Sequence, residues 1–425
     1  MADMVQSDLG PSTVTRAPAP ARVSALDTFR VPSFGLIWLS GLIWHLSRWG
    51  VSFLGSVVVN DLTHSPRLVQ LGGSLLYAPL LVGGVAGGLV SDRFDRLRTV
   101  RLQLAVIVPL TVAIGALAAA GRLQVWMLYL YMFMVGIGWV TDMTSRRAMV
   151  FDIVGPQRMG NAMALESLSL SSGAVIGPLV GGTALKAIGT GPSYYVIAAM
   201  VAVAFVVLLP VRRPPPVAAN RPATPARPIQ DLRDGIRVLR SNRGVMSILG
   251  VTAIANFFLF AYTPLVPVVA QRLGAEAFMV GLLAAASGVG MMTGSLVVAR
   301  LQPVRRGLVY VAGVASAMVL LLGFTLADTY WLAFALLVAV GVGGGLFGST
   351  QSALVMAESP EHLRGRALGL LSMAIGALPL GMYVLGEVAQ HLGIAEALAI
   401  HVGLGLALHL AWIARHPEVR RITTD

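Results

Sequence analysis

The stretch Gly87 to Val100, GGLVSDRFDRLRTV, contains a cluster of ionised side chains that begins at Asp92 and interrupts a long apolar sequence. The whole chain has 425 residues, of which 56% are hydrophobic and 12% are charged, with a mean hydropathy of +0.77. Soluble domains carry about a quarter charged residues. The composition therefore predicts a membrane protein in which this stretch is a loop between spanning helices.

Apolar runs on both sides of that loop are long enough to cross about 30 Å of hydrocarbon. Twelve such runs predict twelve membrane helices, at 34–59, 69–91, 101–120, 124–147, 160–184, 192–211, 246–270, 278–299, 308–327, 330–350, 366–389 and 393–414. Residues 1–30 have no apolar core of the signal-peptide type, so we expect a disordered tail there. The chain has no cysteine, which excludes disulfides, thiolate catalysis and cysteine metal sites.

Basic residues set the predicted orientation. Most of the 31 Lys and Arg fall in loops on one side of the twelve-helix layout. The positive-inside rule then places both termini in the cytoplasm and the chain in the cell membrane as a multi-pass protein. An anionic inner leaflet accounts for the net charge of +12, so no nucleic-acid partner is expected.

The chain divides into two similar halves. Residues 213–245 are first Pro-rich and then periodic, which predicts a cytoplasmic linker with an amphipathic helix on the membrane surface, the alternative being a solvated helix. Gly88 and Pro156 in the first half have counterparts at Gly294 and Pro360, at nearly the same offset. We infer a duplicated six-helix unit, with bundles at 31–212 and 246–415 and a cytoplasmic tail at 416–425.

The opening stretch resembles the signature between helices two and three of the major facilitator superfamily: a glycine, an apolar pair, Asp-Arg, and a further basic cluster. Its D-R-F-D-R form resembles the exporter branch, which includes siderophore exporters and drug-efflux proteins. GNAMALESLSLSSGAVIGPLVGG is similar to the helix-five signature of exporters, and SPEHLRGRALGL resembles the matching loop before helix eleven. The resemblance implies an all-α membrane protein with twelve transmembrane helices in two pseudo-symmetric bundles.

For the charged loop, the resemblance implies a gate. Gly88 leaves room for a neighbouring helix, and Asp92 is expected against the N-terminal end of helix eleven, near Arg366, where unpaired N–H groups favour an anion. A charge network would then hold the halves together on the cytoplasmic side when the cavity opens outward; its members are Asp92, Arg93, Asp95 and Arg96. The alternative is that these charges only anchor the topology.

The helix-five signature is carried by glycines and a proline, namely Gly173, Gly177, Pro178, Gly181 and Gly182. Gly173 and Gly177 share one helix face, and Pro178 removes a backbone hydrogen bond, so we expect a kinked and tightly packed helix. Where the family has a further glycine, this chain has Ala164.

Ionisable residues inside predicted spans are candidates for proton coupling, because charge is costly in hydrocarbon. Glu166 ranks first; the alternative is a permanent ion pair or contact with cytoplasmic water. Arg48 is expected to meet an anionic substrate group or a carboxylate, or else to pair structurally or snorkel outward. Asp142 fits a local pair with Arg146 at i+4 better. Antiporters of this family carry an arginine where this chain has Met132, so Arg48 and Glu166 are expected to take its place.

Aromatic and amide side chains in helices one, two and seven are candidates for a substrate cavity, with lipid or interface contact as the alternative. They are Trp44, His45, Trp49, Tyr77, Asn256, Phe260 and Tyr262. GGGLFG at 343–348 satisfies G-x-G-x-x-G but follows no strand, which predicts helix packing rather than nucleotide binding. Hydrolase and ATP-loop motifs are absent from the sequence, so neither an enzyme nor a cofactor is expected, and the His spacing indicates no metal site.

These features together predict a monomeric secondary transporter that exports a small amphipathic or hydrophobic compound, such as a drug-like molecule or a siderophore, in exchange for protons. Its partners are then the small-molecule substrate, protons and membrane lipids. The alternatives are movement of a lipid or lysolipid between leaflets, import instead of export, and a membrane sensor that transports nothing.

Overall fold

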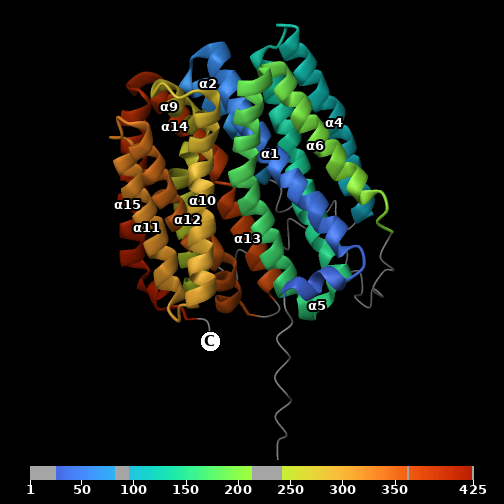
Figure 1. Cartoon of the computed structure of the whole chain (residues 1–425). Helices are drawn as coiled ribbons and strands as arrows, with labels where there is room; N and C mark the ends of the chain where they lie inside the picture. Colours follow the sequence, from blue (N-terminus) through green and yellow to red (C-terminus); the bar gives the residue numbers. More distant parts are fainter. Residues whose placement is uncertain (1–24, 82–94, 213–241, 361–362, 424–425) are drawn as a thin grey trace, which may run out of the picture.

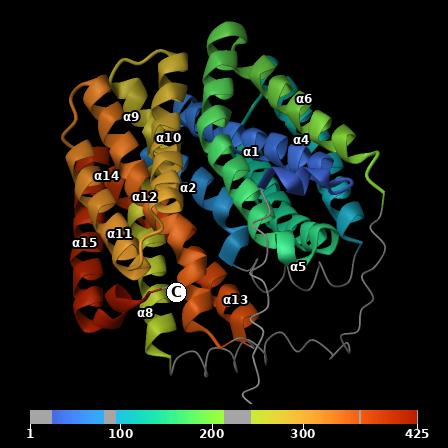
Figure 2. The ribbon, with the colours of Figure 1, turned by 60° about the horizontal axis from the view of Figure 1, so that its bottom comes forward.

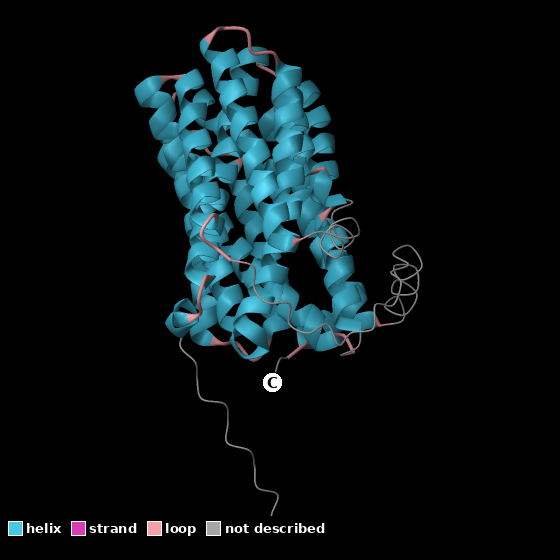
Figure 3. Ribbon diagram, turned by 90° about the vertical axis from the view of Figure 1, so that its right-hand side faces the viewer, coloured by secondary structure: helices cyan, strands magenta, loops and turns pink. Residues whose placement is uncertain are grey.

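The computed structural model describes residues 25–81, 95–212, 242–360 and 363–423. Helices make up all the regular structure in these ranges (Figure 3). Eleven of them are long and apolar enough to cross a membrane, and each coincides with a predicted span. The remaining predicted span, 69–91, begins in α2, and its second part lies outside the described residues.

The N-terminal half comprises η1 (Ala25–Arg30), α1 (Phe34–Thr63), α2 (Pro66–Tyr77), α4 (Arg96–Ala119), α5 (Val125–Ile188) and α6 (Thr190–Leu208). α5 holds two spans, which separate at Gly155, where φ is 71° and the backbone is not helical. Such a positive φ suits glycine, which has no Cβ to clash. Gly155 therefore turns the chain at the end of helix four without a long loop.

The C-terminal half comprises α8 (Arg243–Ile254), η2 (Ala255–Leu259), η3 (Phe260–Leu265), α9 (Val266–Arg272), α10 (Ala277–Leu301), α11 (Arg306–Phe324), α12 (Tyr330–Glu358), α13 (Arg364–Ile375), α14 (Leu378–Leu392), α15 (Ile394–Arg415) and η5 (Pro417–Arg421). One span runs from α8 to α9 through a π-helical and a 3₁₀ turn, with Pro264 inside the latter. α13 and α14 form another span, interrupted before Pro379. Both interruptions occur where proline removes a backbone donor.

Two domain boundaries differ from the prediction. Ala25–Arg30, assigned to the disordered tail, form η1, in which Phe29 contacts Phe34 and Trp38 edge to face. α8 begins at Arg243, inside the predicted linker, because Asn242 caps it by accepting a hydrogen bond from the Val245 N–H at 3.1 Å. The rest of the linker and its predicted amphipathic helix lie outside the described residues.

The two halves lie side by side (Figures 1 and 2). α4 begins at Arg96, α11 begins at Arg306, and α15 ends at Arg415. The C-terminus is marked below the lower ends of α11 and α15 in Figure 1, and we call this end of the helices the basic end. α2, α9 and α14 reach the opposite end. If the positive-inside rule holds for this chain, the basic end faces the cytoplasm.

Close backbone approach holds the C-terminal half together. A Cβ added at Gly290 would overlap the Val338 oxygen, and one added at Gly345 would overlap the Met291 oxygen. α10 and α12 thus pack through glycine, which permits such contact in membrane helices. The GGGLFG stretch lies within α12, so the prediction that it is a helix-packing feature is confirmed.

Candidate transport site

Of the predicted gate, the structure describes Asp95 and Arg96, while Gly88, Asp92 and Arg93 lie outside the described residues. Asp95 caps α4, its carboxylate accepting a hydrogen bond from the Arg98 N–H at 2.8 Å. Arg96 forms an ion pair with Asp152 of α5, in the same half. The charged loop is therefore fixed to helix four at this point, and its proposed contact with helix eleven stays a prediction.

The helix-five glycines lie against α1. A Cβ at Gly177 would lie 2.6 Å from the Leu46 oxygen, and one at Gly173 would lie 2.9 Å from the His45 oxygen. A Cβ at Gly181 would lie 2.7 Å from the Phe53 ring. The three glycines recur at every fourth residue, so one face of α5 contributes no side chain to its contact with α1.

Pro178 and Gly182 lie on another face of the same helix, toward the C-terminal half. A Cβ at Gly281 of α10 would lie 2.5 Å from the Pro178 oxygen, and one at Gly182 would lie 2.7 Å from the Ala277 oxygen. The signature therefore joins helix five both to its own half and to the other half. Within α5 the backbone angles leave the helical region at Gly155, and the kink expected at Pro178 stays a prediction.

Asp142 and Arg146 form a buried ion pair, as the i+4 spacing indicated. The side chains are 1% and 6% exposed, and Arg146 donates to both carboxylate oxygens, the shortest bond being 2.6 Å. Its remaining nitrogen, Nη1, donates to the Ile37 oxygen of α1 at 2.8 Å. Because the carboxylate and the guanidinium are paired and hydrogen-bonded, their attraction offsets much of the desolvation penalty of burying them. The pair joins α5 to α1, and Asp142 is engaged by Arg146.

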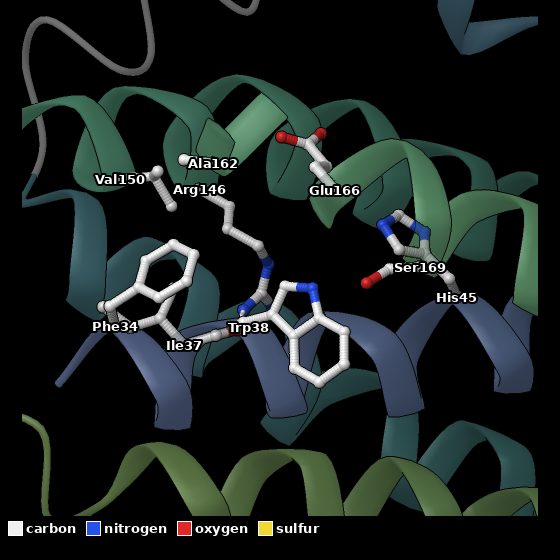
Figure 4. Close-up of a pocket in the computed structure, with 10 residues that line it drawn as sticks. Phe34, Ile37, Trp38, His45, Arg146, Val150, Ala162, Glu166 and Ser169 are labelled. Atoms are coloured by element: carbon white, nitrogen blue, oxygen red, sulfur yellow. Dashed lines mark hydrogen bonds between the residues drawn. The ribbon is translucent and has the colours of Figure 1, made fainter. Parts of the chain in front are cut away.

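Glu166 forms an ion pair with Arg147, at 2.8 Å between Oε1 and Nε. Its side chain is 15% exposed, while that of Arg147 is 45% exposed. Glu166 also lines a small pocket between α1 and α5 with His45, Arg146 and Ser169 (Figure 4). The cavity volume of about 20 Å³ holds about one water molecule. This pocket is thus too small for a substrate.

Arg48 is buried, with 1% of its surface exposed. Its guanidinium carbon lies 4.1 Å from the ring centre of Trp139, 4.8 Å from that of Trp49 and 5.9 Å from that of Tyr77. Among the described residues, its Nε and Nη1 have no hydrogen-bond partner. The predicted carboxylate partner is therefore not found in the described part of the chain, and aromatic faces surround the charge instead.

The predicted cavity residues divide between the two halves. Trp44 and His45 are buried in the N-terminal half, and the Trp44 indole N–H and the His45 Nδ1 have no partner among the described residues. In the C-terminal half, Asn256 donates to the Thr252 oxygen at 2.9 Å. Phe260 is half-buried, with its ring centre 5.7 Å from that of Phe347, and Tyr262 is buried.

The structure gathers some of these residues and separates others. Arg48, Trp49 and Tyr77 meet, and Trp139 joins them, although nothing in its sequence context distinguishes it from an ordinary apolar position. His45 and Glu166 line the small pocket. None of the described contacts joins Arg48 to Glu166, which were predicted to act together.

Sequence reasoning also missed a set of contacts between the halves, which we call the interhalf bonds. They are Asn60 to Gln271 (2.8 Å), Ser65 to Gln390 (2.6 Å), Gln70 to the Ala261 oxygen (2.9 Å), Ser74 to the Pro379 oxygen (2.8 Å), Asp61 to Gln271 (3.0 Å), and the ion pairs Arg67–Glu387 and Lys186–Glu276. Among bonds whose two partners are both described, these are the ones that cross between the halves. All involve elements that reach the end opposite the basic end (Figure 1).

Comparison with known proteins relates this sequence to a protein family. The sequence model of the Major Facilitator Superfamily matches residues 37–379 and 251–423. Enterobactin exporter EntS of Escherichia coli O1:K1 / APEC is 26% identical over 387 residues, covering 88% of this chain and 89% of that protein. The Citrobacter koseri protein of the same name is 26% identical over 364 residues, covering 82% and 85%.

Solved structures show the same fold at lower identity. A bacterial homologue of the human lysosomal transporter Spinster, inward-facing and unoccupied, has a TM-score of 0.71 at 16% identity, covering 92% of this chain and 98% of that chain. A D-xylose-proton symporter has a TM-score of 0.73 at 16% identity, covering 94% and 100%. With a family match along most of its length and twelve helices in two bundles, the chain belongs to the major facilitator superfamily and is a multi-pass membrane transporter of a small molecule.

Proposed function

We propose that the chain exports a small amphipathic or hydrophobic compound across the cell membrane in exchange for protons, by alternating access of one site between the two halves. The observation that carries the proposal is the 26% identity to an exporter over 88% of the chain. Both termini would then lie in the cytoplasm, and the protein would work as a monomer.

The interhalf bonds support the alternation. They close the end opposite the basic end, with Ser74 and Gln70 both buried in that contact. Opening that end requires breaking them, and closing the basic end requires new contacts there. The Asp92 gate is the proposed source of those contacts. We expect Asp92→Asn to lower transport while leaving membrane abundance unchanged; undiminished transport would remove Asp92 from the gate.

Glu166 is the proposed proton carrier. Its side chain is 15% exposed and pairs with Arg147, whose side chain is 45% exposed, so one member of the pair borders water. Glu166→Gln is expected to abolish transport driven by a pH gradient while leaving substrate binding intact. Full gradient-driven transport by that variant would exclude Glu166 as the carrier.

The function is tested by measuring compound accumulation in an efflux-deficient bacterial host, with a panel of dyes, drugs and siderophores. Cells that express the chain should accumulate less of at least one compound, and a protonophore should erase the difference. A matched host expressing Glu166→Gln serves as control. Flux of fluorescent lipid instead would favour the lipid-transport alternative, and binding without flux in proteoliposomes would favour the sensor.

A further inference from the structure

Arg48 is a buried cation enclosed by the aromatic rings of Trp49, Tyr77 and Trp139, a set of side chains that we call the Arg48 cage. A guanidinium has N–H donors and no acceptor, and it stays charged at all physiological pH values. Such a group is rarely buried without a carboxylate or several hydrogen-bond acceptors. Here the side chain is 1% exposed, and both Nε and Nη1 have no partner among the described residues.

Further donors of the same kind lie beside it on α1. The indole N–H of Trp49, whose ring is 4.8 Å from the guanidinium carbon, and that of Trp44, one helical turn before Arg48, also have no partner in the described part of the chain. An indole nitrogen only donates. Among the described residues, Arg48 and its two neighbouring tryptophans therefore have hydrogen-bond donors that lack acceptors.

The nearby acid is already engaged. Asp142 follows Trp139 by three residues on α5 and so lies one turn away on the same helix. Both of its carboxylate oxygens accept hydrogen bonds from Arg146, whose Nη1 donates to the backbone of α1. Turning Asp142 toward Arg48 would leave Arg146 as a buried unpaired charge, which is strongly unfavourable.

Access to the cage is linked to the opening of the halves. Tyr77 closes one side of it, at the end of α2. Ser74, three residues earlier on the same helix, bonds to the Pro379 oxygen of α14 in the other half. If α2 moves when that interhalf bond breaks, Tyr77 would move with it. Arg48 is enclosed in this arrangement, and on the alternating-access proposal it would be uncovered in the opposite one.

We propose that Arg48, with Trp49, Tyr77 and Trp139, binds an aromatic acid, a flat ring bearing a carboxylate or an acidic phenol. The anion pairs with the planar fork of the guanidinium, and the ring stacks on the surrounding aromatic side chains. This names the substrate class of the proposed exporter and so rests on the proposed function. It assigns Arg48 to substrate rather than to proton coupling.

The test is ligand binding to the purified full-length chain in lipid nanodiscs, followed by tryptophan fluorescence. The probes are salicylate and its neutral amide, salicylamide, which differ in charge and hardly in shape. We expect the parent chain to bind salicylate more tightly than salicylamide. Arg48→Gln should weaken salicylate binding by about tenfold or more and abolish the discrimination, because a charged hydrogen-bonded pair is lost. Arg48→Lys should fall between them.

Two controls keep the result interpretable. Arg122→Gln changes an exposed arginine in the loop before α5 and should bind as the parent does. Trp139→Leu keeps the charge and removes the nearest ring, so it should weaken both probes while salicylate remains preferred. If the melting curve shows that Arg48→Gln does not fold, the proposal is tested on Arg48→Lys and Trp139→Leu, whose expected salicylate binding is given above.

The proposal is overturned if the parent chain does not bind salicylate, if it binds salicylamide equally well, or if the Arg48 variants bind like the parent. These outcomes are separate from the fate of the export proposal, because binding in nanodiscs needs no flux. If the parent chain exports a panel compound but its Arg48 variants bind salicylate as the parent does, only the proposed anion site at Arg48 is rejected. Arg48-dependent binding without export would reject the export proposal alone.

Discussion

Removing one interhalf bond tests the alternation directly. The hydroxyl of Ser74 is buried and donates to the Pro379 oxygen of α14 at 2.8 Å. On the alternating-access proposal this bond breaks when the end opposite the basic end opens. Ser74→Ala deletes the donor and leaves both helices intact. The variant should therefore raise the free energy of the closed arrangement relative to the open one.

The size of the effect follows from the burial of the bond. A typical hydrogen bond contributes about 0.5 to 1.5 kcal/mol, and a buried acceptor left without a partner costs somewhat more, so we expect about 1 to 2 kcal/mol. That free energy multiplies the open population by about 5 to 30. The matched control is Ser56→Ala, because the hydroxyl of Ser56 bonds to Ser52 one turn back on its own helix, at 3.0 Å. The control should change nothing.

The assay uses the absence of cysteine from the chain. Ala389→Cys introduces a single thiol on α14 at a position that is 2% exposed, next to Gln390, which bonds to Ser65 of the other half. A membrane-impermeant maleimide then reacts in proportion to the open population. Labelling should be about 5 to 30 times faster with Ser74→Ala, in line with the larger open population, and unchanged with Ser56→Ala. Equal rates in the parent and Ser74→Ala would refute the role assigned to this bond.

Three further outcomes are expected. Cross-linking Asn60→Cys to Gln271→Cys, whose native side chains are bonded at 2.8 Å, should stop transport until the link is reduced; continued transport would contradict alternating access. Gly177→Ala, whose Cβ would lie 2.6 Å from a backbone oxygen, should lower the melting temperature of the purified protein by the equivalent of about 1 to 3 kcal/mol. Gly160→Ala, whose Cβ would have no atom within 4 Å, should leave the melting temperature unchanged. The hydrogen bond from Lys186 lowers the pKa of the exposed Glu276 carboxyl, so the ion pair persists as the pH falls from neutral to mildly acidic and is lost only below the ordinary pKa range of Glu. Mild acid should therefore not speed the labelling of Ala389→Cys through loss of this pair. Faster labelling in mild acid that Glu276→Gln abolishes would contradict this prediction.

Local patterns in the sequence were sufficient for the fold. Apolar runs of membrane length predicted every described span, since helix formation in hydrocarbon depends on the length and polarity of a single segment. The i+4 spacing of Asp142 and Arg146 likewise indicated their ion pair, because both members lie on one helix. The glycines of GGGLFG were recognised as packing residues for the same reason.

Contacts between segments far apart in the chain needed the tertiary structure. The partners of Ser74 and Gln70 lie more than a hundred residues away, and no periodicity within α2 points to them. Arg48 was visible as a charge in a span, but its cage combines α1, α2 and α5. Sequence alone determined that this chain crosses the membrane in two repeated bundles, because burial in lipid is decided segment by segment. The three-dimensional packing decided which end is closed and what surrounds the buried arginine, because those depend on which helix faces meet.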